Sequence, residues 1–205
     1  MTHHRLTLSF YTRDDVTLIA RELLGKRLVS FADGRLTSGY ITETEAYKGI
    51  IDKASHAYGN RRTKRTETMF SEGGIAYIYF CYGMHSLLNV VTNHNGIPHA
   101  VLIRTILPET GMNIMTERIG RQVSDKDGVG PGRVTKLLGL TFADDKEDLV
   151  KGNKIWIEDA GIEVPDTLVK LTPRIGVSYA GEDALLPYRF VITQKELAGL
   201  VKSFL

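Results

Sequence analysis

Apolar side chains recur along the chain at two different spacings, and each spacing predicts one kind of secondary structure. From Val16 to Leu24 they recur at helical spacing behind the acidic pair Asp14 and Asp15, which predicts a helix that Gly25 ends. Further helices are predicted in three later segments: 111–120, 132–140 and 194–203.

Short segments rich in branched and aromatic residues predict strands. In chain order these are 26–31, 35–47, 75–83, 86–92, 99–107, 154–160, 174–180 and 189–194. The turn sequences at 32–34 and 93–98 make antiparallel partners of the strands that they join. A polar segment from Lys48 to about Gly74 has no clear period, and loops of that length are usually functional.

The order of these elements predicts the fold class. Strands come early and late with helices between them, and no alternation of strand and helix suggests parallel crossovers. We therefore expect one α+β domain over residues 1–205, built on a mostly antiparallel or mixed sheet. The composition agrees, because 42% apolar and 24% charged residues in a chain of 205 are typical of a globular domain. These values exclude a disordered chain, a collagen-like repeat and a disulfide scaffold.

Cysteine content and hydropathy indicate the cellular compartment in which the protein is expected. Cys81 is the only cysteine, which excludes an internal disulfide and any site built from several cysteines. No segment approaches the ~20 apolar residues of a membrane span, and the first residues lack the pattern of a signal peptide. A cytoplasmic protein without membrane association is expected.

Charge is distributed unevenly along the chain. The net charge is only +2, but residues 1–105 carry 13 basic and 9 acidic side chains, whereas residues 106–205 carry 13 and 15. A basic half can follow the phosphates of a nucleic acid while an acidic remainder keeps the total low. The asymmetry alone does not establish such a partner.

The predicted strand 35–47 carries the first candidate chemistry. Alternation along a strand places Glu43, Glu45 and Tyr47 on one face. Two carboxylates on one face repel each other, so the pair suggests acid–base catalysis, a metal ion or a face that simply meets solvent. The pair alone does not decide among these.

Three further segments could contact a nucleic acid. They are the aromatic run of Tyr77, Tyr79, Phe80 and Tyr82, the basic loop with Arg61, Arg62, Lys64 and Arg65, and the turn Gly130-Pro131-Gly132 before Arg133. Aromatic rings stack on bases, guanidinium groups neutralise phosphates, and a helix N-terminus attracts anions. Each segment also has an ordinary structural explanation: core packing, a solvated loop or a tight turn.

The order of these motifs resembles a known family. ETEAY at 43–47, ASHA at 54–57, the basic loop, YIYFCYGMH at 77–85, NVV at 89–91, VLIR at 101–104 and GPGRVTKLLGL at 130–140 resemble the alkyladenine (3-methyladenine) DNA glycosylases of the mammalian and Bacillus type. The resemblance begins near residue 20 and continues to about residue 140. It implies a curved sheet with peripheral helices. It also implies an enzyme that flips damaged purines out of duplex DNA and hydrolyses the N-glycosidic bond.

The resemblance also implies roles for individual residues. Glu45 is expected to activate water, with Arg104 beside it. The residues expected to line the base pocket are Tyr47, His56, Tyr79, Asn89 and Leu102. Tyr82 is expected to fill the gap that the extruded base leaves in the duplex. DNA backbone contacts are expected from Arg61, Arg65, Gly130, Gly132 and Arg133.

The expected substrates are 3-methyladenine, 7-methylguanine, hypoxanthine and ethenoadenine in double-stranded DNA. One carboxylate and a water molecule suffice for this reaction, so no cofactor or metal is expected. No lysine lies in a motif for Schiff-base chemistry, which predicts a monofunctional glycosylase without lyase activity. An enzyme that uses one extruded base has no need of a dimer, so a monomer is expected. Two alternatives remain: a non-catalytic nucleic-acid-binding domain, and a metal-dependent hydrolase that uses Glu43, Glu45, Asp52 and His56.

Overall fold

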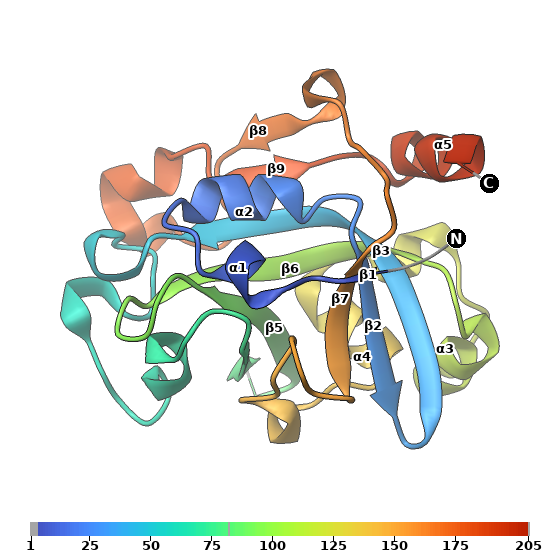
Figure 1. Ribbon diagram of the computed structural model, residues 1–205, viewed down its shortest axis with the longest axis horizontal. Coiled ribbons are helices and arrows are strands. Elements are labelled where there is room, and N and C mark those ends of the chain that lie inside the picture. Colours follow the sequence, from blue (N-terminus) through green and yellow to red (C-terminus); the bar gives the residue numbers. More distant parts are fainter. Residues whose placement is uncertain (1–3, 82, 205) are drawn as a thin grey trace.

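The computed structural model describes residues 4–81 and 83–204, and in this part of the chain one curled sheet of nine strands organises the fold (Figure 1). All of the strand pairs are antiparallel. The strands are β1 (His4–Arg5), β2 (Arg27–Ala32), β3 (Arg35–Tyr47), β4 (Ala76–Cys81), β5 (His85–Thr92), β6 (His99–Pro108), β7 (Ile155–Asp159), β8 (Lys170–Thr172) and β9 (Arg189–Val191).

The strand order is β1-β7-β2-β3-β6-β5-β4, with β9 pairing to β3 and β8 pairing to β9. The long strand β3 is the centre of this arrangement. Its first half pairs with β2 on one edge, its second half pairs with β9 on that same edge, and β6 follows the opposite edge. Asp33 and Gly34 join β2 to β3 with φ angles of 54° and 70°, a turn geometry that suits the twist of a tight hairpin.

Five α-helices flank the described part of the sheet: α1 (Leu8–Tyr11), α2 (Val16–Glu22), α3 (Met112–Ile119), α4 (Pro131–Leu138) and α5 (Gln194–Phe204). The Asp15 carboxylate caps α2 by accepting the backbone N–H groups of Thr17 and Leu18. The chain leaves α2 through Gly25, whose φ of +80° suits glycine. None of the helices in residues 4–81 and 83–204 has the length and apolar character needed to cross a bilayer.

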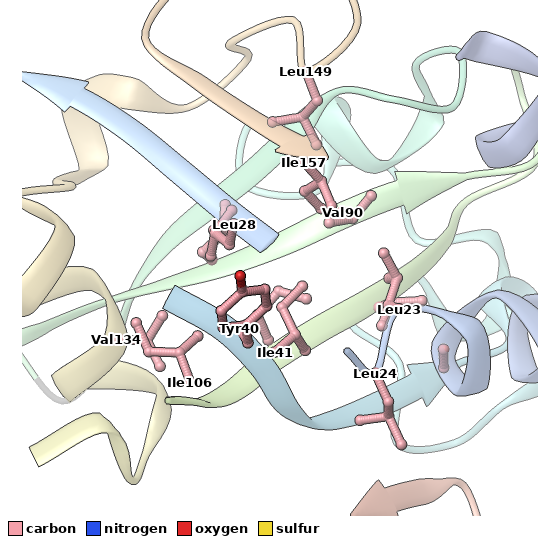
Figure 2. Close-up of a cluster of buried hydrophobic side chains, with 14 of the residues drawn as sticks. Leu23, Leu24, Leu28, Tyr40, Ile41, Val90, Ile106, Val134, Leu149 and Ile157 are labelled. Atoms are coloured by element: carbon pink, nitrogen blue, oxygen red, sulfur yellow. The ribbon is translucent and has the colours of Figure 1, made fainter. Parts of the chain in front are cut away.

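Helices and sheet share one hydrophobic core. Helix α2 packs on β3 and β6, and α4 packs on β5 and β6. Figure 2 shows Leu23, directly after the end of α2, and Val134 of α4 in the same cluster as the strand residues Leu28, Ile41 and Ile106. The prediction of an α+β single domain with a curved, mostly antiparallel sheet and peripheral helices is confirmed.

One predicted strand is wrong. Residues 174–180 form an irregular segment that leads into a 3₁₀ helix, η7 (Ser178–Leu185). The alternating pattern of this segment misled the prediction, because Arg174 turns inward to a buried carboxylate and Gly176 has a φ of +77° that interrupts an extended chain. The polar segment 48–74 forms a loop, as predicted, and contains three short 3₁₀ helices: η1 (Gly49–Ile51), η2 (Tyr58–Asn60) and η3 (Glu67–Phe70).

Candidate active site

The register of four neighbouring strands brings candidate residues into one row. Glu45 of β3 lies opposite Leu102 of β6, Leu102 lies opposite Asn89 of β5, and Asn89 lies opposite Tyr77 of β4. Directly opposed residues project to the same face of a sheet. Antiparallel pairing therefore gathers residues from motifs that are far apart in the sequence.

A pocket of about 400 Å³ lies over this row. The pocket residues expected from the sequence, Tyr47, His56, Tyr79, Asn89 and Leu102, all line it, and so do Arg65 and Arg104. We call the strand residues Tyr47, Tyr77, Tyr79, Asn89, Leu102 and Arg104 the sheet wall. We call Ala54, His56, Arg65 and the segment 175–179 the loop wall. The lining is largely aromatic and apolar, which suits a flat organic ring.

Aromatic rings meet where the two walls join. The rings of His56 and Tyr79 lie 4.7 Å apart at 78°, and His56 Nδ1 lies 3.0 Å from the hydroxyl of Tyr77. Burial, together with the nearby charges of Arg65 and Arg61, lowers the pKa of His56 to about 4, so the imidazole is neutral at neutral pH. A guanidinium only donates, so the 3.4 Å contact from Arg65 makes His56 Nε2 an acceptor and leaves the proton on Nδ1, facing Tyr77.

Glu45 lies behind the pocket wall and is fully buried. One carboxylate oxygen accepts the backbone N–H of Ile175 at 2.8 Å, and the other accepts the hydroxyl of Tyr47 at 2.8 Å. Arg104 Nη1 is 3.4 Å away. Burial raises the pKa of Glu45 despite these partners. A carboxylate with a raised pKa is a stronger base, and its donors all belong to residues that line the pocket.

Glu43, two residues earlier on β3, has a contrasting environment. It accepts hydrogen bonds from Arg104 Nε at 2.9 Å, Arg189 Nε at 2.6 Å and Thr105 Oγ1 at 2.6 Å. Burial alone would raise the pKa of Glu43, but the hydrogen bonds from Thr105 and Arg189 and the charge of Arg104 outweigh burial and lower it. Neighbouring carboxylates with opposite pKa shifts are typical of sites that divide chemical roles. Both side chains are buried, which excludes the solvent-facing interpretation of the pair.

A buried ion pair holds the loop wall together. The Arg174 guanidinium donates to both carboxylate oxygens of Asp52 and to the carbonyl of Ala46 at 2.9 Å. Its Cζ also lies 4.8 Å from the centre of the Tyr47 ring. These contacts fasten the segment after residue 173 to the end of β3, which directs the N–H of Ile175 at Glu45.

Three contributors were not among the residues expected from the sequence: Arg174, Ile175 and Arg189. Tyr77 was expected as part of the aromatic run that could contact a nucleic acid, but not as a pocket residue, although it shares a face with Tyr79. Arg174 and Arg189 gave no signal, because their partners Asp52 and Glu43 are more than a hundred residues away. Ile175 acts through its backbone, which carries no sequence signature.

The residues expected to contact DNA are placed in different surroundings. Arg65 lies at the pocket, with its Cζ 5.1 Å from the centre of the Tyr79 ring. Arg61 is exposed on the loop and is not part of the lining. Arg133 is half exposed and pairs with Asp127 at 2.9 Å. Tyr82 lies outside the described residues.

The glycines of the turn before α4 have structural reasons of their own. Gly130 has a φ of +97°, which favours glycine. A Cβ on Gly132 would stand 2.9 Å from the ring of His85, so only glycine fits there without displacement. Pro131 between them lines the pocket, which places this turn beside it.

The residues of the metal-hydrolase alternative do not form a ligand set. Glu43 is bound by arginines, Asp52 by Arg174, and His56 contacts Tyr77. Across residues 4–81 and 83–204 no three His, Cys, Asp or Glu side chains are grouped as metal ligands.

The pocket thus combines aromatic side chains with a buried carboxylate and an arginine beside them. The comparison with known sequences specifies the class. A family model described as methylpurine-DNA glycosylase matches residues 9–196. The chain belongs to this family and is a DNA glycosylase.

Several bacterial relatives align over almost the whole chain. A provisionally named 3-methyladenine DNA glycosylase of Chlamydia felis is 47% identical over 190 residues, which is 92% of this chain and 96% of the relative. Provisionally named 3-methyladenine DNA glycosylases of Bacillus licheniformis and Desulfitobacterium hafniense are 44% and 38% identical. Those alignments cover 93% and 96% of this chain and 94% and 98% of the relatives.

Proposed function

We propose that this DNA glycosylase removes damaged purines from double-stranded DNA with Glu45 as the general base. The substrates are 3-methyladenine, 7-methylguanine, hypoxanthine and ethenoadenine. The observation that carries the proposal is the double role of Tyr47, which lines the pocket and also donates its hydroxyl to Glu45 at 2.8 Å. Through Tyr47 the surface that would hold the base is joined directly to the group that would activate water.

The base must leave the duplex before it can react, at a cost of a few kcal/mol that is smaller for a damaged base. Tyr47, His56 and Tyr79 supply the aromatic surfaces that receive the extruded ring, and Leu102 and Asn89 form the floor. An aromatic face attracts a cation by about 0.5–2 kcal/mol, which favours alkylated purines that carry a positive charge. The neutral state of His56 suits such a base, because an imidazolium would repel it.

Hydrolysis breaks the bond between the sugar C1′ and the base nitrogen and forms a bond between C1′ and a water oxygen. Glu45 takes the proton of the attacking water and stabilises the positive charge that develops on the sugar. Arg104 holds the water and the adjacent phosphate. A cationic purine leaves as a neutral base, with the electrons of the broken bond cancelling its charge, so it needs no acid.

The surroundings of the pocket supply the DNA contacts in this proposal. Tyr82 fills the space that the base has left, and backbone phosphates meet Arg61, Arg65, Arg133 and the turn of Gly130 and Gly132. A single extruded base is served by one domain, residues 1–205, acting as a monomer. Since its relatives are bacterial and its substrate is DNA, we infer that it works in the cytoplasm of a bacterium.

Release of free bases tests this proposal. A duplex methylated with dimethyl sulfate and a duplex with one hypoxanthine are incubated with the protein in EDTA, and released bases are separated by chromatography. Wild-type protein is expected to release free base and leave the strand uncut at the abasic site, because no lysine takes part. Glu45→Gln is expected to lower the single-turnover rate about 10²–10⁴-fold while duplex binding is kept.

Glu109→Gln is the control, because Glu109 is also a carboxylate that an arginine contacts but lies outside the pocket lining. It should react at the wild-type rate. Absence of base release by the wild type contradicts the proposal. Activity that EDTA abolishes favours a metal-dependent hydrolase, and a Glu45→Gln variant with full activity removes Glu45 from its role.

A further inference from the structure

Four charged side chains from three strands meet beside the pocket. Glu43 and Glu45 come from β3, Arg104 from β6 and Arg189 from β9. In the pairing of β3 with β9, Arg189 lies opposite Glu45, but its guanidinium reaches Glu43 at 2.6 Å. The two carboxylates and two guanidinium groups balance in charge.

The contacts of Arg104 are unequal. Its Nε lies 2.9 Å from Glu43, whereas its Nη1 lies 3.4 Å from Glu45. The register between β3 and β6 shifts on both sides of Glu43, and such irregularities redirect side chains next to active sites. Glu43 therefore anchors the guanidinium, and Glu45 has the weaker contact with it.

We propose that Glu43 and Arg189 form a charge clamp that fixes the position of Arg104 and sets the strength of its contact with the catalytic carboxylate Glu45. This inference rests on the proposed function, in which Glu45 activates water. Arg189 is a positioning residue, because it acts through Glu43 and Arg104. Arg189 neutralises part of the negative charge of Glu43. Glu43 therefore attracts Arg104 less strongly, and Arg104 can contact Glu45 as well.

The groups that face Glu45 give the direction of the effect. Arg104 approaches from β6, Tyr47 and Glu43 belong to the same strand as Glu45, and the N–H of Ile175 comes from the loop wall. Arg174 also lies near Glu45, but its guanidinium is paired with the carboxylate of Asp52. Glu43 is thus the carboxylate that competes with Glu45 for Arg104.

Loss of Glu43 and loss of Arg189 should shift the ionisation of Glu45 in opposite directions. In Glu43→Gln, Arg104 is released toward Glu45 and the repulsion by a second carboxylate disappears, so the ionised form of Glu45 is favoured. In Arg189→Gln, Glu43 keeps its charge and draws Arg104 away, so the ionised form of Glu45 is disfavoured. A purely structural role for either residue would not reverse the sign between the two variants.

The acid limb of the pH–rate profile measures the change in the ionisation of Glu45. Single-turnover release of 7-methylguanine from a methylated duplex is measured from pH 4 to pH 9, because this cationic base needs no protonation and the limb reports Glu45. We expect the limb to move to lower pH in Glu43→Gln and to higher pH in Arg189→Gln, in each case by on the order of one pH unit. Arg189→Lys keeps the charge and should stay near the wild-type profile.

Arg27→Gln is the matched control. It removes a guanidinium that Glu109 and Glu158 share at 3.0 and 2.7 Å on β2, outside the pocket lining, and thermal melting shows whether all variants fold. Limbs that move in the same direction in Glu43→Gln and Arg189→Gln, or that do not move in folded variants, overturn the clamp. Absence of base release by the wild type at every pH overturns the proposed function itself.

Discussion

The two walls of the pocket are held by different forces. The sheet wall is fixed by strand pairing, which places Leu102, Asn89 and Tyr77 beside one another without any charged contact. The loop wall has no regular backbone pairing to hold it and depends on side chains, above all the buried pair of Arg174 and Asp52. Backbone pairing survives most single substitutions, whereas a buried ion pair fails when either partner is lost.

The loop wall should therefore be destabilised by single substitutions more easily than the sheet wall. Asp52→Ala leaves Arg174 buried without its counter-charge, which should cost about 3–5 kcal/mol of unfolding free energy. Activity should fall with it, because the N–H of Ile175 is no longer held at Glu45. Urea denaturation and the single-turnover rate measure both effects.

Asp166→Ala is the matched control for this experiment. Asp166 also pairs with an arginine, Arg21, but its side chain is 93% exposed, so its loss should cost less than about 1 kcal/mol. A loss of stability in Asp52→Ala no larger than in Asp166→Ala would show that the buried pair does not hold the loop wall.

His56 makes the junction of the two walls sensitive to acid. Its pKa is about 4 in the folded protein, against about 6.5 when unfolded. The unfolded chain therefore binds a proton first as pH falls, so the stability due to neutral His56 is present above pH 6.5 and is lost between pH 6.5 and pH 4. The loss should be about 3 kcal/mol, because one pKa unit corresponds to about 1.4 kcal/mol. Urea titrations at several pH values measure it, and His56→Gln should flatten the slope over this range.

The smallest expected effect concerns Arg65 and distinguishes its contact with the Tyr79 ring from its proposed contact with a DNA phosphate. Its guanidinium stands over Tyr79, on an aromatic face that an extruded base would use. In Arg65→Ala, a free purine such as ethenoadenine should bind about 2–5-fold more tightly by fluorescence, because its competitor for the ring is gone. Undamaged duplex should bind more weakly, because a phosphate contact is lost. Arg62→Ala, which removes a cation outside the pocket lining, should weaken duplex binding only; equal changes in both variants would contradict this use of Arg65.

Much of the sheet wall could be predicted from the sequence, because its information is local. Alternation along 35–47 placed Glu43, Glu45 and Tyr47 on one face, and turn sequences at 32–34 and 93–98 paired the right strands. Asp15 marked the start of α2, whereas the helix ends at Glu22, three residues before the predicted stop at Gly25. In each case a few neighbouring residues contain the physical signal, whether a capping side chain, a turn or a period of two.

The loop wall was predicted less well, and 174–180 was assigned to a strand. Its alternating residues resemble a strand, but the conformation is decided by Arg174 meeting Asp52 across 122 positions of the chain. Likewise, the arginine partners of Glu43 and Glu45 determine which carboxylate is ionised most readily, and neither Arg104 nor Arg189 is near them in the sequence.

The sequence by itself therefore determined most of the elements, the faces of the strands and the family to which the chain belongs. Only the tertiary structure decided the opposite pKa shifts of the two carboxylates, Glu43 and Glu45. Alternation and turn chemistry depend on a few neighbouring residues, so a short stretch of the sequence is enough to predict them. The pKa of a buried carboxylate depends on burial and on charges within a few ångströms, and only the folded chain brings those charges together.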